Sequence, residues 1–238
     1  MTFVLILLCA AAVCCVLRNP LRRVPWLFYA LAVAFDVLYF AAGTIGVPRP
    51  VSTALTFAMN KCLLPTALFV LVMYVGVFPK GGAVRKWLQP LRTPVSIIAC
   101  ILVLGHMVRF IGVYAARVLG GGAVAGNVVA SFAIAVVLFA LLAVLGVTSF
   151  EFVRRRMGTS AWRRVQRLAY PFYALVYAHV LVMLGPAALN GGAGALAGVL
   201  VYTAVFGVYA VLRVRRALVD GARGGAAAAE DACPAVAA

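Results

Sequence analysis

The sequence predicts an all-α fold, a polytopic membrane helix bundle of about seven transmembrane helices, and two observations carry that prediction. Hydrophobic residues make up 66% of the 238 residues, the mean hydropathy is +1.11, and only 11% of the residues are charged. A soluble domain of this length has too little interior to bury so many apolar side chains, so most of them must face lipid. The Arg and Lys residues behind the net charge of +16 stand in short clusters between apolar runs, which indicates membrane topology and no nucleic-acid partner.

Seven apolar segments are predicted to cross the bilayer. Their ranges are 2–17, 26–46, 53–78, 95–116, 124–150, 168–186 and 196–212. The first is short, but a secretory signal carries its basic residues before the apolar stretch, whereas here they follow it. We therefore interpret residues 1–25 as an additional N-terminal transmembrane anchor with its basic loop, residues 26–216 as the main transmembrane domain, and the Ala/Gly-rich residues 217–238 as a disordered cytoplasmic tail.

The loops between these segments alternate in their content of basic residues. Four loops on one side hold most of them, namely Arg18, Arg22 and Arg23; Lys80, Arg85, Lys86 and Arg92; Arg154, Arg155, Arg156, Arg163, Arg164 and Arg167; and Arg213, Arg215, Arg216 and Arg223. The loops on the other side have Arg49, Arg109 and Arg117. Because cytoplasmic loops carry the excess of Arg and Lys, the N-terminus is predicted to lie outside and the C-terminus in the cytoplasm.

Two histidines, His106 and His179, are the only ones in the chain, and both lie inside predicted transmembrane helices. Each follows the inner boundary of its helix by the same number of residues, which places both imidazoles about 18 Å above that boundary. An ionisable residue in hydrocarbon is a functional-site hypothesis by default, and two at one depth on helices of the same direction fit the axial ligands of one haem. The alternative is that each histidine only bonds a polar group on a neighbouring helix.

Two segments around these histidines resemble the ferric reductase-like transmembrane family, especially its MsrQ-type members. The first is VLGVTSFEFVRRRMGTSAWRRVQRLAYPFYALVYAHVLVML, in which a helix ending in Thr-Ser, a basic loop and a Trp precede the helix of His179. The second is VRKWLQPLRTPVSIIACILVLGHMVRF, a basic segment followed by the helix of His106. The resemblance covers about residues 26–212, so residues 26–216 are interpreted as a ferric reductase-like haem-binding transmembrane domain.

The resemblance implies a membrane b-type cytochrome of the bacterial inner or plasma membrane, the electron-transfer subunit of an oxidoreductase. Members of the wider family often hold two haems and have a second pair of histidines at the positions of Thr93 and Gln166. Neither residue is a usual haem ligand, so we expect one haem b, held by His106 and His179. Its electrons would come from a quinol or a flavin. They would pass to an extracytoplasmic reductase, as the MsrQ-type members feed a periplasmic methionine sulfoxide reductase, or to an acceptor such as ferric iron.

A second cofactor site is predicted at the inner ends of the two histidine helices. Gln166 stands where the MsrQ-type members keep a histidine. Basic and aromatic residues flank these helix ends, namely Arg92, Trp87, Trp162, Arg163, Arg164 and Arg167. Such side chains suit the phosphate of FMN or a quinone headgroup. The alternative is ordinary positive-inside anchoring with tryptophans at the interface.

Three further polar residues lie within the predicted spans. Asp36 and Lys61 lie at similar depths from the outer boundary, so an intramembrane ion pair is expected between them. Lys61 is also a candidate partner for a haem propionate, and Asp36 a candidate for proton transfer during quinol oxidation. Arg109, one turn after His106, is a second propionate candidate, the alternative being that its side chain reaches the outer headgroups.

A rival interpretation keeps the fold without the haem. A multi-pass transporter or assembly factor would tolerate replacement of both histidines, and the absence of inner haem ligands favours it. The sequence has no CxxCH motif, which excludes a c-type haem. No GxGxxG or P-loop spacing accompanies a strand pattern, so binding of FAD, NAD or ATP by this chain is not expected.

Overall fold

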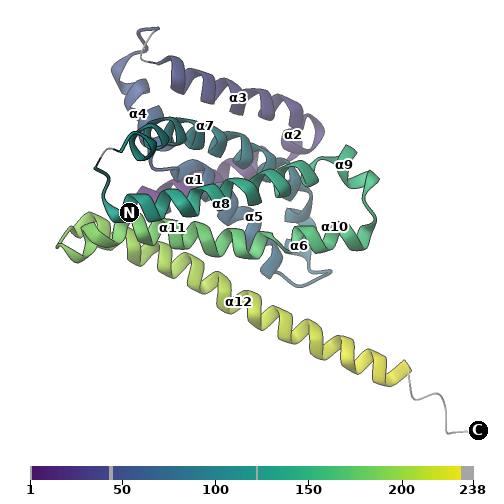
Figure 1. Cartoon of the computed structure of the whole chain (residues 1–238). Coiled ribbons are helices and arrows are strands. Elements are labelled where there is room, and N and C mark those ends of the chain that lie inside the picture. The colour runs from purple at the N-terminus through teal and green to yellow at the C-terminus, as the bar shows by residue number, and fades with distance from the viewer. Residues whose placement is uncertain (1, 43–44, 122, 232–238) are drawn as a thin grey trace, which may run out of the picture.

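The computed structural model describes residues 2–42, 45–121 and 123–231, and all regular structure in them is helical, which confirms the predicted all-α class (Figure 1). The α-helices are α1 (Thr2–Val16), α2 (Arg18–Arg23), α3 (Pro25–Ala41), α4 (Arg49–Asn60), α5 (Leu63–Tyr74), α6 (Ala83–Leu88), α7 (Arg92–Leu119), α8 (Gly126–Ser149), α9 (Glu151–Arg156), α10 (Thr159–Gln166), α11 (Ala169–Leu189) and α12 (Ala193–Asp231). Two short 3-10 helices are η1 (Val75–Val77) and η2 (Gln89–Leu91).

Four helices of the described residues are long and apolar enough to cross a membrane, or five when a bent pair counts as one span. The four are Ala83–Arg117, Gly126–Ser149, Thr159–Leu189 and Ala193–Ala222, and the bent pair joins Arg49–Met59 to Leu63–Val77 at 47°. Helices α1 and α3 are apolar but have only 15 and 17 residues, or about 22 and 26 Å at the rise of an α-helix. The hydrocarbon core is about 30 Å thick. The chain is therefore a multi-pass membrane protein, while seven full spans stay a prediction.

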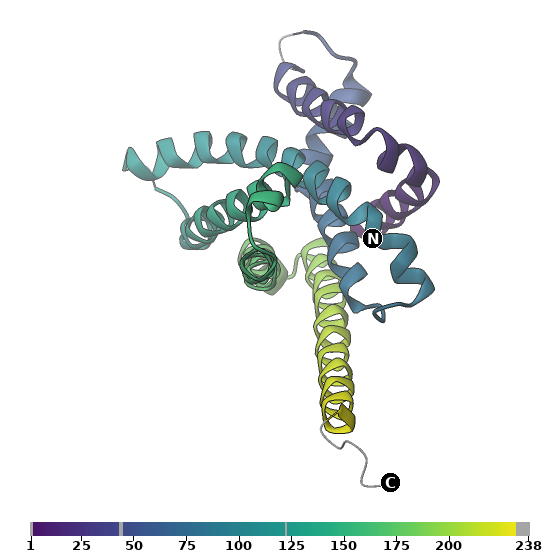
Figure 2. The same cartoon turned by 90° about the vertical axis from the view of Figure 1, so that its right-hand side faces the viewer.

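Helix α5 lies at the centre of the bundle and is apolar on all sides, as a fully surrounded helix must be. α1 and α7 pack against α5, α8 packs against α7 and α11, and α12 packs against α11 (Figures 1 and 2). The N-terminal segment that the sequence suggested as an added anchor thus contributes to the bundle, and the Phe3 ring lies 4.5 Å from that of Tyr202. Large apolar side chains such as Leu31, Phe139 and Val208 point outwards and are exposed, where a membrane would place lipid.

A break between α4 and α5 has a sequence cause. Pro65 has no N–H, and in a continuous helix its ring would clash with the Lys61 carbonyl. The helix ends before that clash, because Cys62 adopts a left-handed backbone with φ of +51°. The Cys62 N–H donates to the carbonyl oxygen of Met59 at 3.0 Å. In an unbroken helix that carbonyl would be reserved for Leu63, so the break makes it accessible to a donor from another helix.

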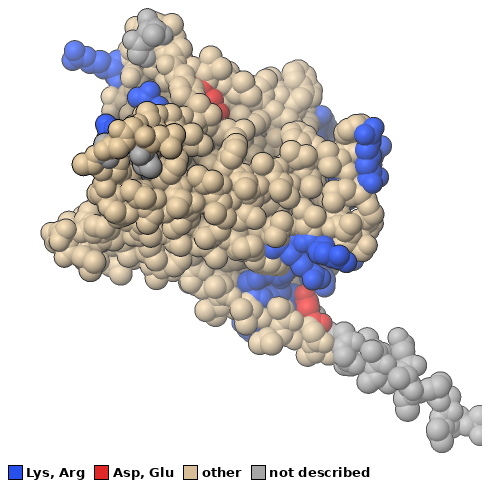
Figure 3. All heavy atoms as spheres, in the orientation of Figure 1, with Lys and Arg blue, Asp and Glu red and all other residues tan. Residues whose placement is uncertain are grey.

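The basic loops that the sequence assigned to one side come together at one end of the bundle, over α9, α10 and the projecting part of α12 (Figure 3). Arg18 of the first loop lies over the Trp87 ring of the second at 5.0 Å, and Lys80 pairs with Asp220 on α12 at 3.5 Å. This grouping fits the positive-inside rule, and the orientation of the termini stays a prediction.

The tail differs from the prediction. Residues 217–231, expected to be disordered, continue α12 as a helix that projects beyond the bundle (Figure 1). Alanine is the best helix former, so an Ala-rich extension of an existing helix costs little. Residues 232–238 of the predicted tail lie outside the described residues.

Candidate functional site

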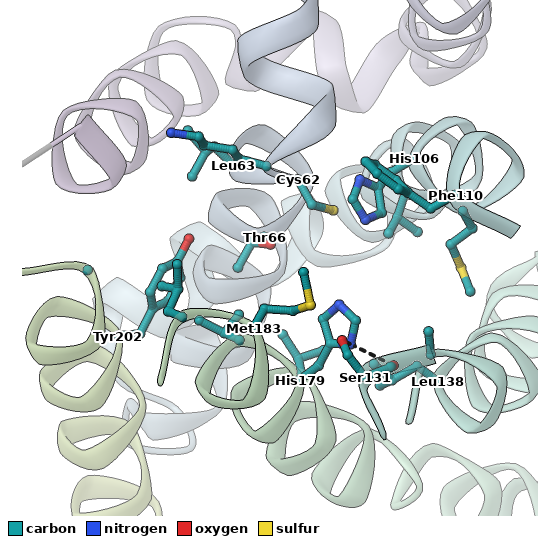
Figure 4. Close-up of a pocket in the computed structure, with 18 of the residues that line it drawn as sticks. Cys62, Leu63, Thr66, His106, Phe110, Ser131, Leu138, His179, Met183 and Tyr202 are labelled. Carbon is teal, nitrogen blue, oxygen red and sulfur yellow. Dashed lines mark hydrogen bonds between the residues drawn. The ribbon is translucent and has the colours of Figure 1, made fainter. Parts of the chain in front are cut away.

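A cavity of about 420 Å³ lies among α5, α7, α8, α11 and α12. Most of its wall is apolar, and its polar side chains include His106, His179, Lys61, Thr66 and Ser131. Figure 4 shows the two histidines projecting from different helices into this common space. Cofactor and ligand sites typically measure about 300 to 1,000 Å³, are mostly apolar and carry a few convergent polar groups. The structure therefore brings the two predicted ligands to one cavity of suitable size.

His106 on α7 is oriented by the break between α4 and α5. Its Nδ1 lies 2.7 Å from the carbonyl oxygen of Met59. A carbonyl can only accept, so Nδ1 carries the proton, and in the neutral imidazole Nε2 keeps its lone pair. The Phe110 ring, 4.7 Å away at 47°, packs against the imidazole on the same helix. His106 is thus fixed in the tautomer that can bind a metal through Nε2.

His179 on α11 has the same arrangement, with Ser131 of α8 as its partner. Its Nδ1 lies 3.2 Å from the Ser131 carbonyl oxygen and 2.9 Å from the Ser131 hydroxyl (Figure 4). The contact with the carbonyl assigns the proton to Nδ1 here too, which again leaves the lone pair on Nε2. Ser131 is 2% exposed, so the position of its backbone is set by helix packing. Both imidazoles therefore have one nitrogen held by the protein and one available to a ligand.

Gly105, next to His106, permits a close approach of three helices. A Cβ at this position would lie 2.7 Å from Cγ of Asp36 on α3 and 2.8 Å from Cε of Met59 on α4. Real Cβ contacts are not so short, so only glycine fits without a shift. The side chain of Met59, the residue whose carbonyl is the partner of His106, is thus packed directly against the residue before His106.

The predicted ion pair between Asp36 and Lys61 does not form. Oδ1 of Asp36 is buried and has no hydrogen-bond partner. The Lys61 ammonium lies over the Phe57 ring at 5.1 Å, and the residue is exposed at the cavity wall. Equal depth along the chain therefore does not bring the two side chains together, and Lys61 contacts Phe57 of its own segment instead. Arg109, the other propionate candidate, is exposed and does not line the cavity.

The predicted inner site is assembled only in part. Arg92 and Gln166 line a cavity of about 50 Å³ near the inner ends of α7 and α11. The side-chain amide of Gln166 donates to the Thr148 hydroxyl at 3.1 Å, and the Trp162 indole donates to the Thr148 carbonyl oxygen at 3.1 Å. One water occupies about 30 Å³ of liquid, so a cavity of this size suits a few waters and not a flavin or quinone ring.

The other predicted members of the inner site lie elsewhere. Arg163 and Arg167 are exposed and do not line the small cavity. Trp87 stands on α6 beside Arg18, which also donates from Nε to the Trp87 carbonyl oxygen at 3.2 Å. These residues fit the alternative interpretation, an interfacial band of arginine and tryptophan.

Sequence reasoning did not identify three residues that shape the main site. Ser131 offered a signal, a hydroxyl in an otherwise apolar stretch of α8. Gly105 directly precedes a histidine, which alone indicates nothing. The Met59 carbonyl has no side-chain signal, because its role depends on the break that Pro65 imposes.

The fold and the site together define a class, a multi-pass helical membrane protein with two half-buried imidazoles on one apolar cavity. Residues 61–177 match the family model described as ferric reductase like transmembrane component. This match confirms the resemblance to the ferric reductase-like transmembrane family over these residues, while the resemblance to the MsrQ-type members stays a prediction. The match includes His106 and ends just before His179.

A curated relative is similar to this chain over a longer segment than the family match. An uncharacterized protein of Treponema pallidum (strain Nichols) is 41% identical to this chain over 179 residues, which is 75% of this chain and 49% of the relative. The chain thus spans about half the length of that protein. No solved structure matches the chain.

Proposed function

We propose that this protein is a membrane b-type cytochrome that carries one haem between His106 and His179 and passes electrons towards an extracytoplasmic acceptor. The observation that supports it most is the matched hydrogen bonding of the imidazoles, because each Nδ1 faces a backbone carbonyl oxygen, at 2.7 and 3.2 Å. Metal-binding histidines generally donate their other ring N–H to such an acceptor, which fixes ring orientation and raises basicity. Two imidazoles prepared in this way on one cavity are what bis-histidine ligation requires.

The residues of the cavity fit haem b in chemistry as well as in volume. No group of three or more His, Cys, Asp or Glu lies together in the part of the chain that the structure describes. Two imidazoles suffice for haem, because the porphyrin supplies the remaining iron ligands. Lys61 offers a cation at the wall for a propionate, and the apolar lining keeps water away. When bound, haem b would supply a one-electron redox centre, and ligation by both His106 and His179 would leave the iron no open position for a substrate.

The packing of the inner half supports a single haem. Phe172 and Tyr173 are buried there, and the Phe172 ring lies 5.3 Å from that of Phe69, between the two cavities. Thr93, at one position where the wider family has its second histidine pair, is exposed and does not line the small cavity. Side chains therefore fill the region where a second macrocycle would have to lie.

A quinol is the donor that these observations favour. The small inner cavity does not accommodate an isoalloxazine ring, whereas a quinol dissolves in the bilayer and reaches the exposed apolar faces of the bundle. FMN bound to this chain is the alternative donor. The resemblance to the MsrQ-type members favours a reductase outside the cytoplasm of a bacterial cell as the acceptor.

The proposal predicts electron exchange on both sides of the haem. In right-side-out membrane vesicles that contain the protein, duroquinol should produce the absorbance of a reduced b-type cytochrome, and membrane-impermeant ferricyanide should remove it. Matched vesicles with His106→Ala should show neither change. Reduction that depends on added FMN and a flavin reductant, and not on quinol, would replace the quinol by a flavin. A protein that exchanges electrons with no donor would contradict the proposed function.

A further inference from the structure

Four half-buried arginines meet at the basic end of the bundle, away from the cavity of the histidines. They are Arg85 on α6, Arg92 at the start of α7, and Arg213 and Arg216 on α12. Arg85 lies within electrostatic range of the other three. The chain separates the two pairs by more than a hundred residues, and the packing of α12 against η1 joins them. We refer to these four residues as the arginine cluster.

The protein neutralises this cluster only in part. Asp220 contacts Arg216, and its other oxygen lies 3.5 Å from Lys80. No other carboxylate among the described residues forms an ion pair with the cluster. Partly buried cations repel one another and are costly to desolvate unless an anion pairs with them. The cluster is therefore short of negative charge.

Arg216 has an unused donor that faces inwards. Its side chain is 10% exposed, and its Nε is buried without a hydrogen-bond partner. Arg213 and Arg85 are held in place instead, since they donate to backbone carbonyl oxygens at 3.3 and 3.2 Å. A buried donor left unsatisfied on a charged group is strongly unfavourable, so native structures rarely keep one. Two anchored guanidiniums beside one with a free buried donor form a prepared anion site.

We propose that the arginine cluster binds a phosphate group, and that this phosphate belongs to an anionic phospholipid. The planar guanidinium fork matches phosphate oxygens, which supply both the missing charge and acceptors for Arg216. A lipid is favoured as the source because the cluster stands with the other basic residues at one end of the bundle, where the positive-inside rule places the boundary of the bilayer and its anionic headgroups. The Tyr170 ring lies under the Arg213 guanidinium at 5.3 Å and is 43% exposed. Tyrosines of this kind lie at headgroup level in membrane proteins, so the headgroup can meet the cluster there. The proposal does not depend on the haem.

The test uses the full chain in detergent and measures lipid retention by native mass spectrometry during titration with phosphatidylglycerol. Arg216→Gln is expected to weaken binding on the order of tenfold, because it removes a buried charge-assisted donor. Arg215→Gln is the matched control, since Arg215 is the neighbouring residue on α12 but is exposed, and it should behave like the unchanged protein. Arg92→Gln provides a second variant in the cluster if the first does not fold. Phosphatidylcholine, whose headgroup carries no net charge, should bind weakly to all of them.

Three outcomes would overturn the proposal or part of it. Equal binding of phosphatidylglycerol by the Arg216→Gln, Arg92→Gln and Arg215→Gln variants would overturn the site. Equal binding of phosphatidylcholine and phosphatidylglycerol would overturn recognition of an anionic lipid. Inorganic phosphate or FMN could also displace the lipid at a lower concentration than phosphatidylglycerol itself requires for binding, and this displacement could be absent in the Arg216→Gln variant. That result would overturn the lipid as the source and assign the phosphate to a soluble molecule.

Discussion

Replacing either His106 or His179 with alanine is expected to reduce the haem content from one per chain to nearly none, while the protein still inserts into the membrane. Each imidazole is proposed as an axial ligand, and loss of one removes half of the protein's bonds to the iron. Insertion depends on the apolar lengths of α7 and α11, which one substitution does not change. The measurement is haem per chain by the pyridine haemochrome method, with size-exclusion chromatography to verify that the variants are folded.

Two further variants separate ligation from cavity packing. Phe110→Leu changes a residue that packs against His106 and lines the cavity but offers no ligand atom, so it should retain haem. His179→Met should also retain haem and raise its midpoint potential, because a thioether ligand favours the reduced iron more than imidazole does. A full haem complement in both alanine variants would rule out the ligand assignment and favour the rival protein without haem.

Gly105→Ala is expected to have the next largest effect, although it adds only one methyl group and touches no ligand. The new Cβ would lie 2.7 Å from Cγ of Asp36 and 2.8 Å from Cε of Met59, and Met59 is fully buried, so both side chains would have to shift within packed surroundings. Overpacking of this kind costs about 1–3 kcal/mol. Moving Met59 also disturbs the carbonyl that holds His106, and loss of such a partner typically weakens metal binding by about 10- to 100-fold. Haem affinity, measured by titration of the haem-free protein, should fall accordingly.

Gly112→Ala is the matched control for that change. Gly112 lies two turns further along α7, and a Cβ there meets no atom within 4 Å. The substitution should leave haem affinity unchanged and add slightly to helix stability. Equal affinities for the two alanine variants would mean that the contact of Gly105 with Met59 does not position His106.

The fold class and the histidine pair could be predicted from the sequence because both depend on one-dimensional patterns. Apolar composition decides between membrane and water, and a fixed rise per residue converts spacing into depth. His106 and His179 line one cavity, which agrees with the equal depths predicted for them. The alternative of a bond to a neighbouring helix was also partly right, since Nδ1 of each ring makes such a bond while Nε2 remains available.

Depth alone does not give the direction in which a side chain points. Asp36 and Lys61 were expected to pair because their depths agree, yet the Lys61 ammonium lies over the ring of Phe57, four residues earlier in the chain. Likewise Trp87 and Arg92 are close in sequence, but Trp87 stands beside Arg18 and Arg92 lines the small inner cavity. Tertiary packing decides these directions, and one sequence does not contain a simple pattern for it.

Helix length was also less predictable than helix identity. The sequence predicts spans at 2–17 and 26–46, whereas α1 and α3 end at Val16 and Ala41 and are shorter than the hydrocarbon core. Apolar residues continue beyond α3, but Gly43 and Pro48 interrupt a helical pattern there, and residues 43–44 lie outside the described part. Hydropathy identifies an apolar segment, but it does not predict the residue at which the helix in that segment ends.

The most direct test of the central claim is a reduced-minus-oxidised visible spectrum of the purified protein, with haem measured per chain. We predict the spectrum of a low-spin b-type cytochrome and one haem per chain, held by the two imidazoles and limited to one by the side chains that fill the inner half. Two haems per chain would contradict the packing argument. A flat spectrum from folded protein that was supplied with haem would contradict the cytochrome itself.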